Sequence, residues 1–265
     1  MSRKFSVLMC VYNKEKASNL KECLDSIFNQ TIKPNQVVVV LDGPLRRALM
    51  DVLSNYELDI YKLKEQKGLT YALNYGLKKC KYDLVARMDS DDICIENRFE
   101  LLLKEFSKDK NLVLVGGQII EFNGNEIKKK RIVPTSKKEI IKFSKKRNPF
   151  NHMSVMYKKN VIIGLGGYPN MDYFEDYYLW MEILKNNYSV KNINEIIIKA
   201  RSDNNHIKRR GGIKYIKYIR NFEKELYKEG YIDRKCCIIN IIERVFISIL
   251  PNSLRKTTYN IFLRK

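Results

Sequence analysis

The segment Val37-Val38-Val39-Val40-Leu41-Asp42-Gly43-Pro44 is an apolar run that stops abruptly at three turn-forming residues. Apolar and polar residues do not alternate in it, which is the pattern of a strand buried on both faces of a parallel sheet. A second apolar run, Phe5–Val11, ends at Tyr12-Asn13 and is followed by apolar residues at helical spacing between Leu20 and Phe28. These segments predict a strand, a helix and a second, parallel strand.

The same alternation continues along the chain. It predicts further strands at 59–63, 84–88 and 112–115, with helices at about 70–79 and 96–106. Repeated units of this kind predict an α/β sheet that binds its ligands at the carboxyl ends of the strands. Beyond residue 118 the pattern is mixed, and it predicts helices at 136–146, 174–185 and from 211 onward, with one strand near 154–157 and a lysine-rich stretch at 128–131.

Composition indicates a globular, basic protein. The 265 residues are 45% hydrophobic and carry a net charge of +20, which is concentrated after residue 100. We expect this second part to face an anionic partner, for which a nucleic acid, an anionic lipid surface and a phosphorylated substrate are candidates. A solvated basic surface is the alternative.

Cysteine usage and the apolar tracts bear on where the protein acts. Six cysteines include no C-x-x-C pair, which indicates a reducing compartment. The longest apolar tract, 236–250, is interrupted by Glu243-Arg244 and is shorter than the roughly 18–20 residues that span a bilayer. We therefore expect a cytoplasmic protein.

The sharpest local feature is Arg87-Met88-Asp89-Ser90-Asp91-Asp92, in which a predicted strand is followed by clustered carboxylates. Such carboxylates repel one another, and a hard cation such as Mg²⁺ or Mn²⁺ would remove that repulsion while bridging to substrate phosphate. The alternative is a solvated acidic turn that caps the helix after it.

With its neighbours, this segment resembles the GT-A-fold glycosyltransferases of family 2, similar to the exopolysaccharide and O-antigen transferases of the amylovoran type. Four motifs besides the aspartate cluster carry the resemblance: 11–15, Asp42-Gly43, the segment from Gly68 through Asn74 to Gly76, and Glu175-Asp176. The resemblance also draws on 147–152 and 208–212. It implies a nucleotide-sugar half at about 1–117, an acceptor half at about 118–205, and a helical extension at 206–265.

The resemblance also implies where the nucleotide sugar binds. Asp91, with Asp89, would hold Mn²⁺ or Mg²⁺, and Asp89 would also face the ribose. Asp92 would orient the site or hold the donor sugar, and Arg87 would contact the donor or form a local ion pair. The other residues implied in donor binding are Val11, Tyr12, Asn13, Glu15, Asp42, Gly68, Asn74 and Ser90.

Inversion by direct displacement requires a base that accepts the proton of the attacking hydroxyl. Asp176 is our candidate, and Glu175 would contact the acceptor or cap the helix, since adjacent helical residues point about 100° apart. The resemblance implies that His152 lies near the acceptor, and the alternative is a structural histidine. Arg209 and Arg210 would bind diphosphate oxygens, and His206 is a candidate ligand that completes the metal site.

The expected function is an inverting, metal-dependent transfer of a hexose from a nucleotide sugar, by default UDP-linked, to a lipid-diphosphate-linked glycan of a bacterial surface polysaccharide. The helical extension at 206–265 carries apolar residues at helical spacing with basic residues nearby. This suits peripheral binding to the inner face of the plasma membrane, with packing on the catalytic domain or a second subunit as alternatives.

Three other classes are disfavoured. A phosphatase of the Asp-x-Asp-x-Thr type would need Thr where Ile93 stands, although other phosphoryl-transfer enzymes stay open. A nucleic-acid-binding protein is disfavoured because the basic residues form no recognisable reading motif. A Rossmann dehydrogenase would need a Gly-x-Gly-x-x-Gly turn at residues 11–14, which is missing.

Overall fold

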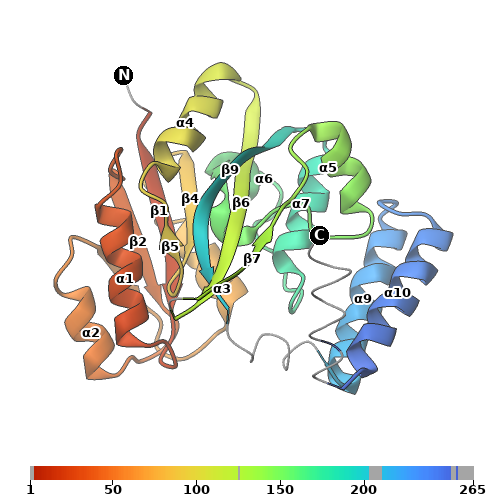
Figure 1. Cartoon of the computed structure of the whole chain (residues 1–265), viewed down its shortest axis with the longest axis horizontal. Coiled ribbons are helices and arrows are strands. Elements are labelled where there is room, and N and C mark those ends of the chain that lie inside the picture. Colours follow the sequence, from red (N-terminus) through yellow and green to blue (C-terminus); the bar gives the residue numbers. More distant parts are fainter. Residues whose placement is uncertain (1–2, 125, 203–210, 252–254, 256–265) are drawn as a thin grey trace.

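The computed structural model describes residues 3–124, 126–202, 211–251 and 255. One mixed sheet forms its centre, with the strand order β3-β2-β1-β4-β8-β6-β9-β5 and with β7 paired to β6 (Figure 1). The strands are β1 (Phe5–Val11), β2 (Gln36–Leu41), β3 (Asp59–Lys62), β4 (Leu84–Asp89), β5 (Ile93–Cys94), β6 (Leu112–Asn123), β7 (Glu126–Arg131), β8 (Met156–Lys158) and β9 (Ser189–Arg201).

The first four strands form the parallel half that the apolar runs predict. Strand β1 lies between β2 and β4 and pairs in parallel with both. In this register Val11 lies opposite Leu41, and Cys10 lies opposite Asp89. The carboxyl ends of β1, β2 and β4 therefore meet at one edge of the sheet, as expected for parallel strands whose ends bind ligands.

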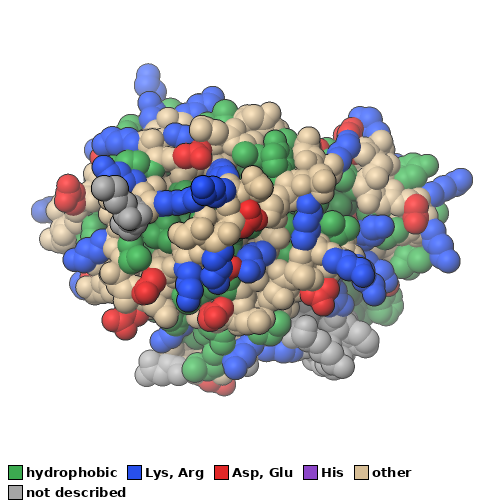
Figure 2. Space-filling model, turned by 90° about the horizontal axis from the view of Figure 1, so that it is seen from above, with side chains coloured by type: hydrophobic (Ala, Val, Ile, Leu, Met, Phe, Trp, Pro, Cys, Tyr) green, Lys and Arg blue, Asp and Glu red, His purple; other side chains and the backbone are tan. Residues whose placement is uncertain are grey.

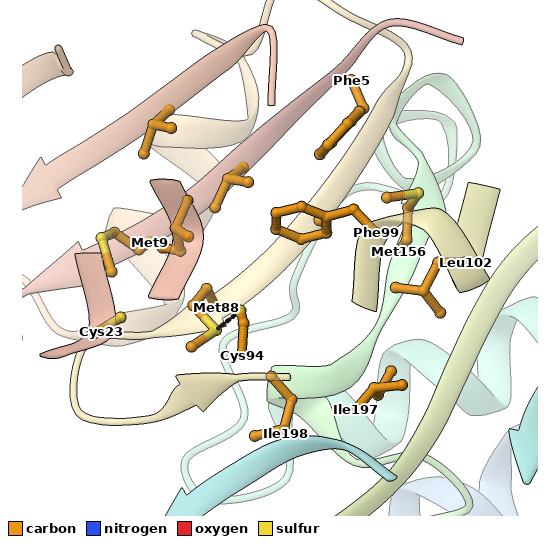
Figure 3. Packing of buried hydrophobic residues seen from close by; sticks show 14 of the residues in the cluster. Phe5, Met9, Cys23, Met88, Cys94, Phe99, Leu102, Met156, Ile197 and Ile198 are labelled. Carbon is orange, nitrogen blue, oxygen red and sulfur yellow. Dashed lines mark hydrogen bonds between the residues drawn. The ribbon is translucent and has the colours of Figure 1, made fainter. Parts of the chain in front are cut away.

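Helices cover both faces of the sheet and bury it. The helices are α1 (Ala17–Phe28), α2 (Arg47–Leu53), α3 (Leu69–Leu77), α4 (Arg98–Lys108), α5 (Lys137–Ser144), α6 (Lys159–Gly164), α7 (Glu175–Lys185), α9 (Ile213–Lys228) and α10 (Arg234–Ile249). Helices α1, α2 and α4 pack on one face, where Met9, Met88 and Phe99 are fully buried (Figure 3). Helices α3, α5, α6 and α7 supply buried residues to the other face.

Helix α3 approaches the sheet so closely that Gly76 has no room for a side chain. A Cβ there would lie 2.5 Å from Leu8 Cδ1 and 2.7 Å from Val40 Cγ2. This contact fixes α3, and with it the loop at Gly68, against the parallel strands.

The second half of the sheet differs from the pattern read in the sequence. Strand β6 continues to Asn123, and β9 (Ser189–Arg201), which was not among the expected strands, pairs with it in parallel over most of its length. The lysine-rich stretch at 128–131 lies in β7, which pairs with β6. Strand β6 crosses the expected boundary at residue 117, so both halves share one sheet.

The C-terminal helices α9 and α10 form an antiparallel hairpin at the far side of the molecule from α1 and α2 (Figure 1). Phe222 of α9 stacks on Phe174, with the ring centroids 4.3 Å apart, and joins a buried cluster with Tyr177 and Met181 of α7. Buried Glu223 forms an ion pair of 2.9 Å with Arg244 of α10. Within the described ranges, none of the helices has both the length and the apolar character that crossing a membrane requires.

Candidate functional site

Asp42 organises the sheet edge where β1 and β2 end. Its backbone N–H donates to the carbonyl of Val11 at 2.8 Å. Its carboxylate accepts from the backbone N–H groups of Lys67, at 2.7 Å, and of Gly68, at 3.1 Å. Gly68 adopts a φ of 89°, which favours glycine, directly before α3. Since the side chain of Val11 is fully buried, Val11 faces this edge with its backbone.

The loop after β1 is joined to the aspartate cluster through Glu15. This buried carboxylate accepts from the Lys16 backbone at 2.7 Å and from the Ser90 hydroxyl at 3.0 Å. Asn13 accepts from the backbone of Arg46 at 2.7 Å. Tyr12, in contrast, exposes 37% of its surface. The bond between Glu15 and Ser90 therefore joins the loop after β1 to the loop after β4. Tyr12 is accessible to a ligand.

Arg87 and Asp89 form an ion pair at the end of β4. The sequence left two roles open for Arg87, contact with the donor and a local ion pair, and the structure contains the ion pair. Arg87 is only 2% exposed, and its Nε and Nη1 atoms have no hydrogen-bond partner among the described residues. Burial lowers the pKa of Arg87, but neighbouring Asp89 raises it above its usual range. A permanent positive charge thus lies near the end of β4, and the Nε and Nη1 atoms that carry it have no hydrogen-bond partner among the described residues.

Asp91 and Asp92 have different surroundings. Burial, followed by the charges of Asp89 and Glu15, raises the pKa of Asp91 to about 7. Asp92 is almost completely buried, and its Oδ1 accepts from the backbone N–H of Arg201 at 2.8 Å. Burial and the neighbouring aspartates raise the pKa of Asp92 well above its usual value. Asp92 therefore ties this loop to the end of β9, whereas Asp91 is the more accessible carboxylate.

These carboxylates fit a divalent cation that also binds substrate. Asp89 and Asp91 offer the hard oxygen ligands that Mg²⁺ and Mn²⁺ prefer, and the charge of Asp89 adds to the effect of burial in raising the pKa of Asp91. The part of the chain that the structure covers contains no group of three or more His, Cys, Asp or Glu side chains arranged to hold a metal. Two carboxylates with diphosphate oxygens and water are sufficient ligands for such an ion. His206, the candidate further ligand, lies outside the described residues.

Helix α7 brings Glu175 and Asp176 to the site at its first turn. Asp176 accepts from the Asn148 side-chain amide and from the Tyr177 backbone N–H, both at 2.7 Å. Burial and the adjacent charge of Asp176 raise the pKa of Glu175 to about 7, and Arg87 is close enough to oppose that shift. Arg87 opposes the shift of Asp91 in the same way, so its charge connects the two acidic groups.

His152 and Asn74, both half-buried, belong to one hydrogen-bonded network that runs through the buried Tyr168. The two amide atoms of Asn74 bind the backbone of Tyr168 reciprocally, at 2.7 and 2.8 Å. The Tyr168 hydroxyl lies 3.1 Å from His152 Nε2. Burial, followed by the charge of Arg87, lowers the pKa of His152 well below its usual value. His152 thus has a hydrogen-bond partner within the protein, which suits a structural role, and its contact with the acceptor stays a prediction. Arg209 and Arg210 lie outside the described residues.

Three side chains at the site were not singled out in the sequence. Asn148 orients Asp176, Tyr168 contacts His152, and Arg201 binds the loop at Asp91 through its Nε at 3.0 Å from the Asp91 carbonyl. Each of these contacts joins residues at least 16 positions apart in sequence, and the contact of Arg201 joins residues 110 positions apart. A local pattern does not reveal such contacts; the only available signal was the Ile196-Ile197-Ile198 run, which suits a strand ending near Arg201.

Comparison with known proteins adds to this geometry. Residues 6–163 match the family model described as glycosyl transferase family 2. The UDP-Gal:alpha-D-GlcNAc-diphosphoundecaprenol beta-1,3-galactosyltransferase of Escherichia coli is 39% identical over 99% of this chain and 97% of that protein. The amylovoran biosynthesis glycosyltransferase AmsE of Erwinia amylovora is 38% identical over 84% of each chain.

Solved structures share the architecture. Staphylococcus aureus TarS 1–349 in complex with UDP-GlcNAc superposes with a TM-score of 0.67 over 98% of this chain and 76% of that one, at 16% identity. The mannosyltransferase PcManGT from Pyrobaculum calidifontis, in complex with GDP-Man and Mn²⁺, has a TM-score of 0.64 over 100% of this chain and 82% of that one, at 15% identity. At these identities the likeness shows the fold, and it confirms the GT-A expectation.

Proposed function

The chain belongs to glycosyl transferase family 2, and on that premise we propose that it transfers a hexose from UDP to a lipid-diphosphate-linked glycan, with inversion, during the synthesis of a bacterial surface polysaccharide. It is a glycosyltransferase, so the phosphoryl-transfer and nucleic-acid-binding alternatives are set aside. The E. coli relative is named for both this donor class and this acceptor class.

One observation carries the proposal. Asp42, Asp89 and Asp91 lie where neighbouring parallel strands end. Gly68 binds Asp42, and the next residue, Leu69, lines the same cleft as Glu175 of α7. A nucleotide at the strand ends would therefore place its sugar between the aspartate cluster and α7. When bound, Mn²⁺ or Mg²⁺ would be held by Asp91 and Asp89 and would neutralise charge on the diphosphate.

The residues of this chain have distinct tasks in the displacement. The acceptor hydroxyl oxygen attacks the anomeric carbon, and the electron pair of the breaking bond leaves with the nucleoside diphosphate. Asp176 accepts the hydroxyl proton, and the hydrogen bonds from Asn148 and Tyr177 hold both of its oxygens in fixed directions. The buried charge of Arg87 favours negative charge developing at the strand ends.

Donor turnover is the test of this function. In the presence of Mn²⁺ and without acceptor, we expect UDP release from at least one of UDP-glucose, UDP-galactose and their N-acetyl forms. We also expect UDP at about 100 times its Kd to raise Tm by several degrees, since binding at that excess stabilises the folded state by about 2.7 kcal/mol. GDP and TDP serve as matched controls. Release of inorganic phosphate, or stabilisation by an oligonucleotide but by no nucleoside diphosphate, would contradict the proposal.

We further propose that α10 binds an anionic membrane at the inner face of the plasma membrane. Its exposed apolar residues fall within an arc of about 100° at helical spacing. They are Ile238, Ile239, Ile242, Phe246 and Ile249. The neighbouring α9 exposes basic side chains, which are Lys214, Lys217, Arg220, Lys224 and Lys228. Figure 2 shows Lys and Arg spread over the molecule, with hydrophobic and basic groups both present on the helical hairpin. An apolar stripe beside a basic face is typical of helices that lie in anionic interfaces.

Flotation with vesicles measures this binding. We expect the protein to float with phosphatidylcholine vesicles that contain 30% phosphatidylglycerol and to float less with phosphatidylcholine alone. The double variant Ile242→Asn, Phe246→Asn should bind at least about tenfold more weakly, since each exposed apolar side chain contributes on the order of 1.5 kcal/mol when buried. Ile127→Asn, on β7, is the matched control. If the double variant floats normally but loses a dimer detected by sedimentation, the stripe binds a second subunit instead.

A further inference from the structure

Tyr173 has a backbone conformation that a tyrosine rarely adopts. Its φ is 69°, in the left-handed region that favours glycine, and it immediately precedes the buried Phe174 at the start of α7. Such a conformation costs on the order of 1–3 kcal/mol and tends to persist at functional sites. The ring is nevertheless 44% exposed, so burial of Tyr173 does not account for that cost.

The Tyr173 ring is held in a defined direction by aromatic neighbours. Its centroid lies 5.2 Å from that of Tyr215, edge to face, and 5.3 Å from that of Tyr218. Both belong to α9, where Tyr215 is buried. Next to Tyr173, Phe174 is stacked on Phe222 of the same helix. The C-terminal hairpin thus supports an aromatic surface that is packed on its inner side and accessible on its outer side.

This surface forms one side of a cleft of about 280 Å³. Three segments that are far apart in sequence line it: the start of α3, the turn before α7, and α9. The lining residues are Leu69, Thr70, Asp172, Tyr173, Glu175 and Tyr218. Glu175 precedes Asp176 directly on α7, so the cleft reaches the helical turn that carries the proposed base. Its volume is near the lower end of the roughly 300–1,000 Å³ of small-molecule sites, which suits a single sugar ring.

The residues that line the cleft suit a sugar ring better than a diphosphate. Aromatic faces carry negative charge and attract the C–H hydrogens of a pyranose face, while carboxylate and hydroxyl oxygens bind its hydroxyl groups. Asp172 and Glu175 would repel a diphosphate, so the anionic part of the acceptor belongs elsewhere. The nucleotide is expected at Asp42 and Tyr12, where the parallel strands end.

We propose that this cleft is the subsite for the acceptor pyranose, the ring whose hydroxyl attacks the donor. Tyr173 and Tyr218 stack on its apolar face, and Thr70 and Asp172 bind hydroxyl groups that the reaction does not use. The catalytic half and the C-terminal hairpin therefore both contact the acceptor, and α9 contributes to its selection. This inference rests on the proposed function, whose test is the separate turnover of donor.

Saturation-transfer NMR tests the subsite without requiring transfer. The probes are the methyl α-pyranosides of glucose, galactose, GlcNAc and GalNAc, each added to protein that contains UDP and Mn²⁺. We expect at least one to receive saturation at its ring C–H protons. Its Kd should rise at least about fivefold in Tyr218→Ala and in Tyr173→Gly, a substitution that also relieves the backbone.

The control is Tyr227→Ala, which removes an exposed tyrosine elsewhere on α9 and should leave the pyranoside Kd unchanged. The Kd of UDP should be the same in all variants. The subsite is overturned if no pyranoside binds the wild-type protein, or if both cleft variants bind the pyranoside as the wild type does. Donor turnover that persists in that case leaves the proposed function standing, whereas absent turnover contradicts the function itself.

Discussion

Asp176→Asn is expected to lower kcat by about 10²–10⁴-fold, the range that a positioned general base contributes. The substitution preserves the volume of the side chain, and an amide oxygen still accepts from Asn148 at the place where Asp176 now accepts at 2.7 Å. The variant cannot take up the proton of the acceptor hydroxyl, however. The affinity for UDP should not change, because the nucleotide is expected at the strand ends and not at α7.

Glu175→Gln is the matched control for this prediction. Glu175 is the neighbouring carboxylate on the same helical turn, and it lines the cleft that we assign to the acceptor. Its replacement should raise the KM for acceptor and leave kcat within about tenfold of the wild type, an order-of-magnitude bound for a residue outside proton transfer. If transfer continues in Asp176→Asn and stops in Glu175→Gln, the two roles are reversed.

Asn148 and the backbone of α7 together determine how Asp176 is oriented. Its amide donates to one carboxylate oxygen, and the helix backbone at Tyr177 donates to the other. The position of the base is therefore fixed by two segments that lie 28 residues apart in sequence. Glu175 and Asp176 are adjacent, but their side chains leave the helix about 100° apart, which is why we propose different roles for them.

The parallel half of the fold could be predicted because its strands β1, β2 and β4 are buried along almost their whole length. The Val37–Leu41 run is uniformly apolar and is bounded by Asp42-Gly43, so its length and ends are visible in the sequence. Strand β9 could not be predicted in this way. It mixes buried residues such as Ile197 with exposed ones such as Asn194 and Glu195, and its pairing with β6 contains register shifts.

The candidate site was predictable where one segment supplies both its structure and its chemistry. The aspartates after β4 are such a case, because the apolar strand and the carboxylates are continuous in sequence. The aromatic cleft is the opposite case. It depends on a positive φ at Tyr173 and on the approach of Tyr218 to Leu69, and the spacing of residues along the chain encodes neither.

Asp91→Asn is expected to abolish most of the Mn²⁺ binding that accompanies UDP, and to lower kcat by at least about 10²-fold through loss of charge stabilisation at the diphosphate. Titration calorimetry with Mn²⁺ at saturating UDP gives a readout that does not depend on transfer. Because the ligand must be deprotonated and the pKa of Asp91 is raised to about 7, Mn²⁺ affinity of the wild type should increase with pH up to about that value.

Asp92→Asn distinguishes ligation of the cation by Asp91 from attraction of the cation by the net negative charge of the loop. Asp92 is the adjacent carboxylate, but its Oδ1 accepts from the Arg201 backbone, a bond that an asparagine oxygen can also accept. We therefore expect this variant to retain its Mn²⁺ affinity within a few-fold. Equal losses in the two variants would mean that net negative charge, and not ligation by Asp91, attracts the cation. Undiminished transfer by wild-type enzyme after treatment with a chelator would remove the cation from the reaction altogether, and basic side chains such as Arg87 would then have to stabilise the departing diphosphate.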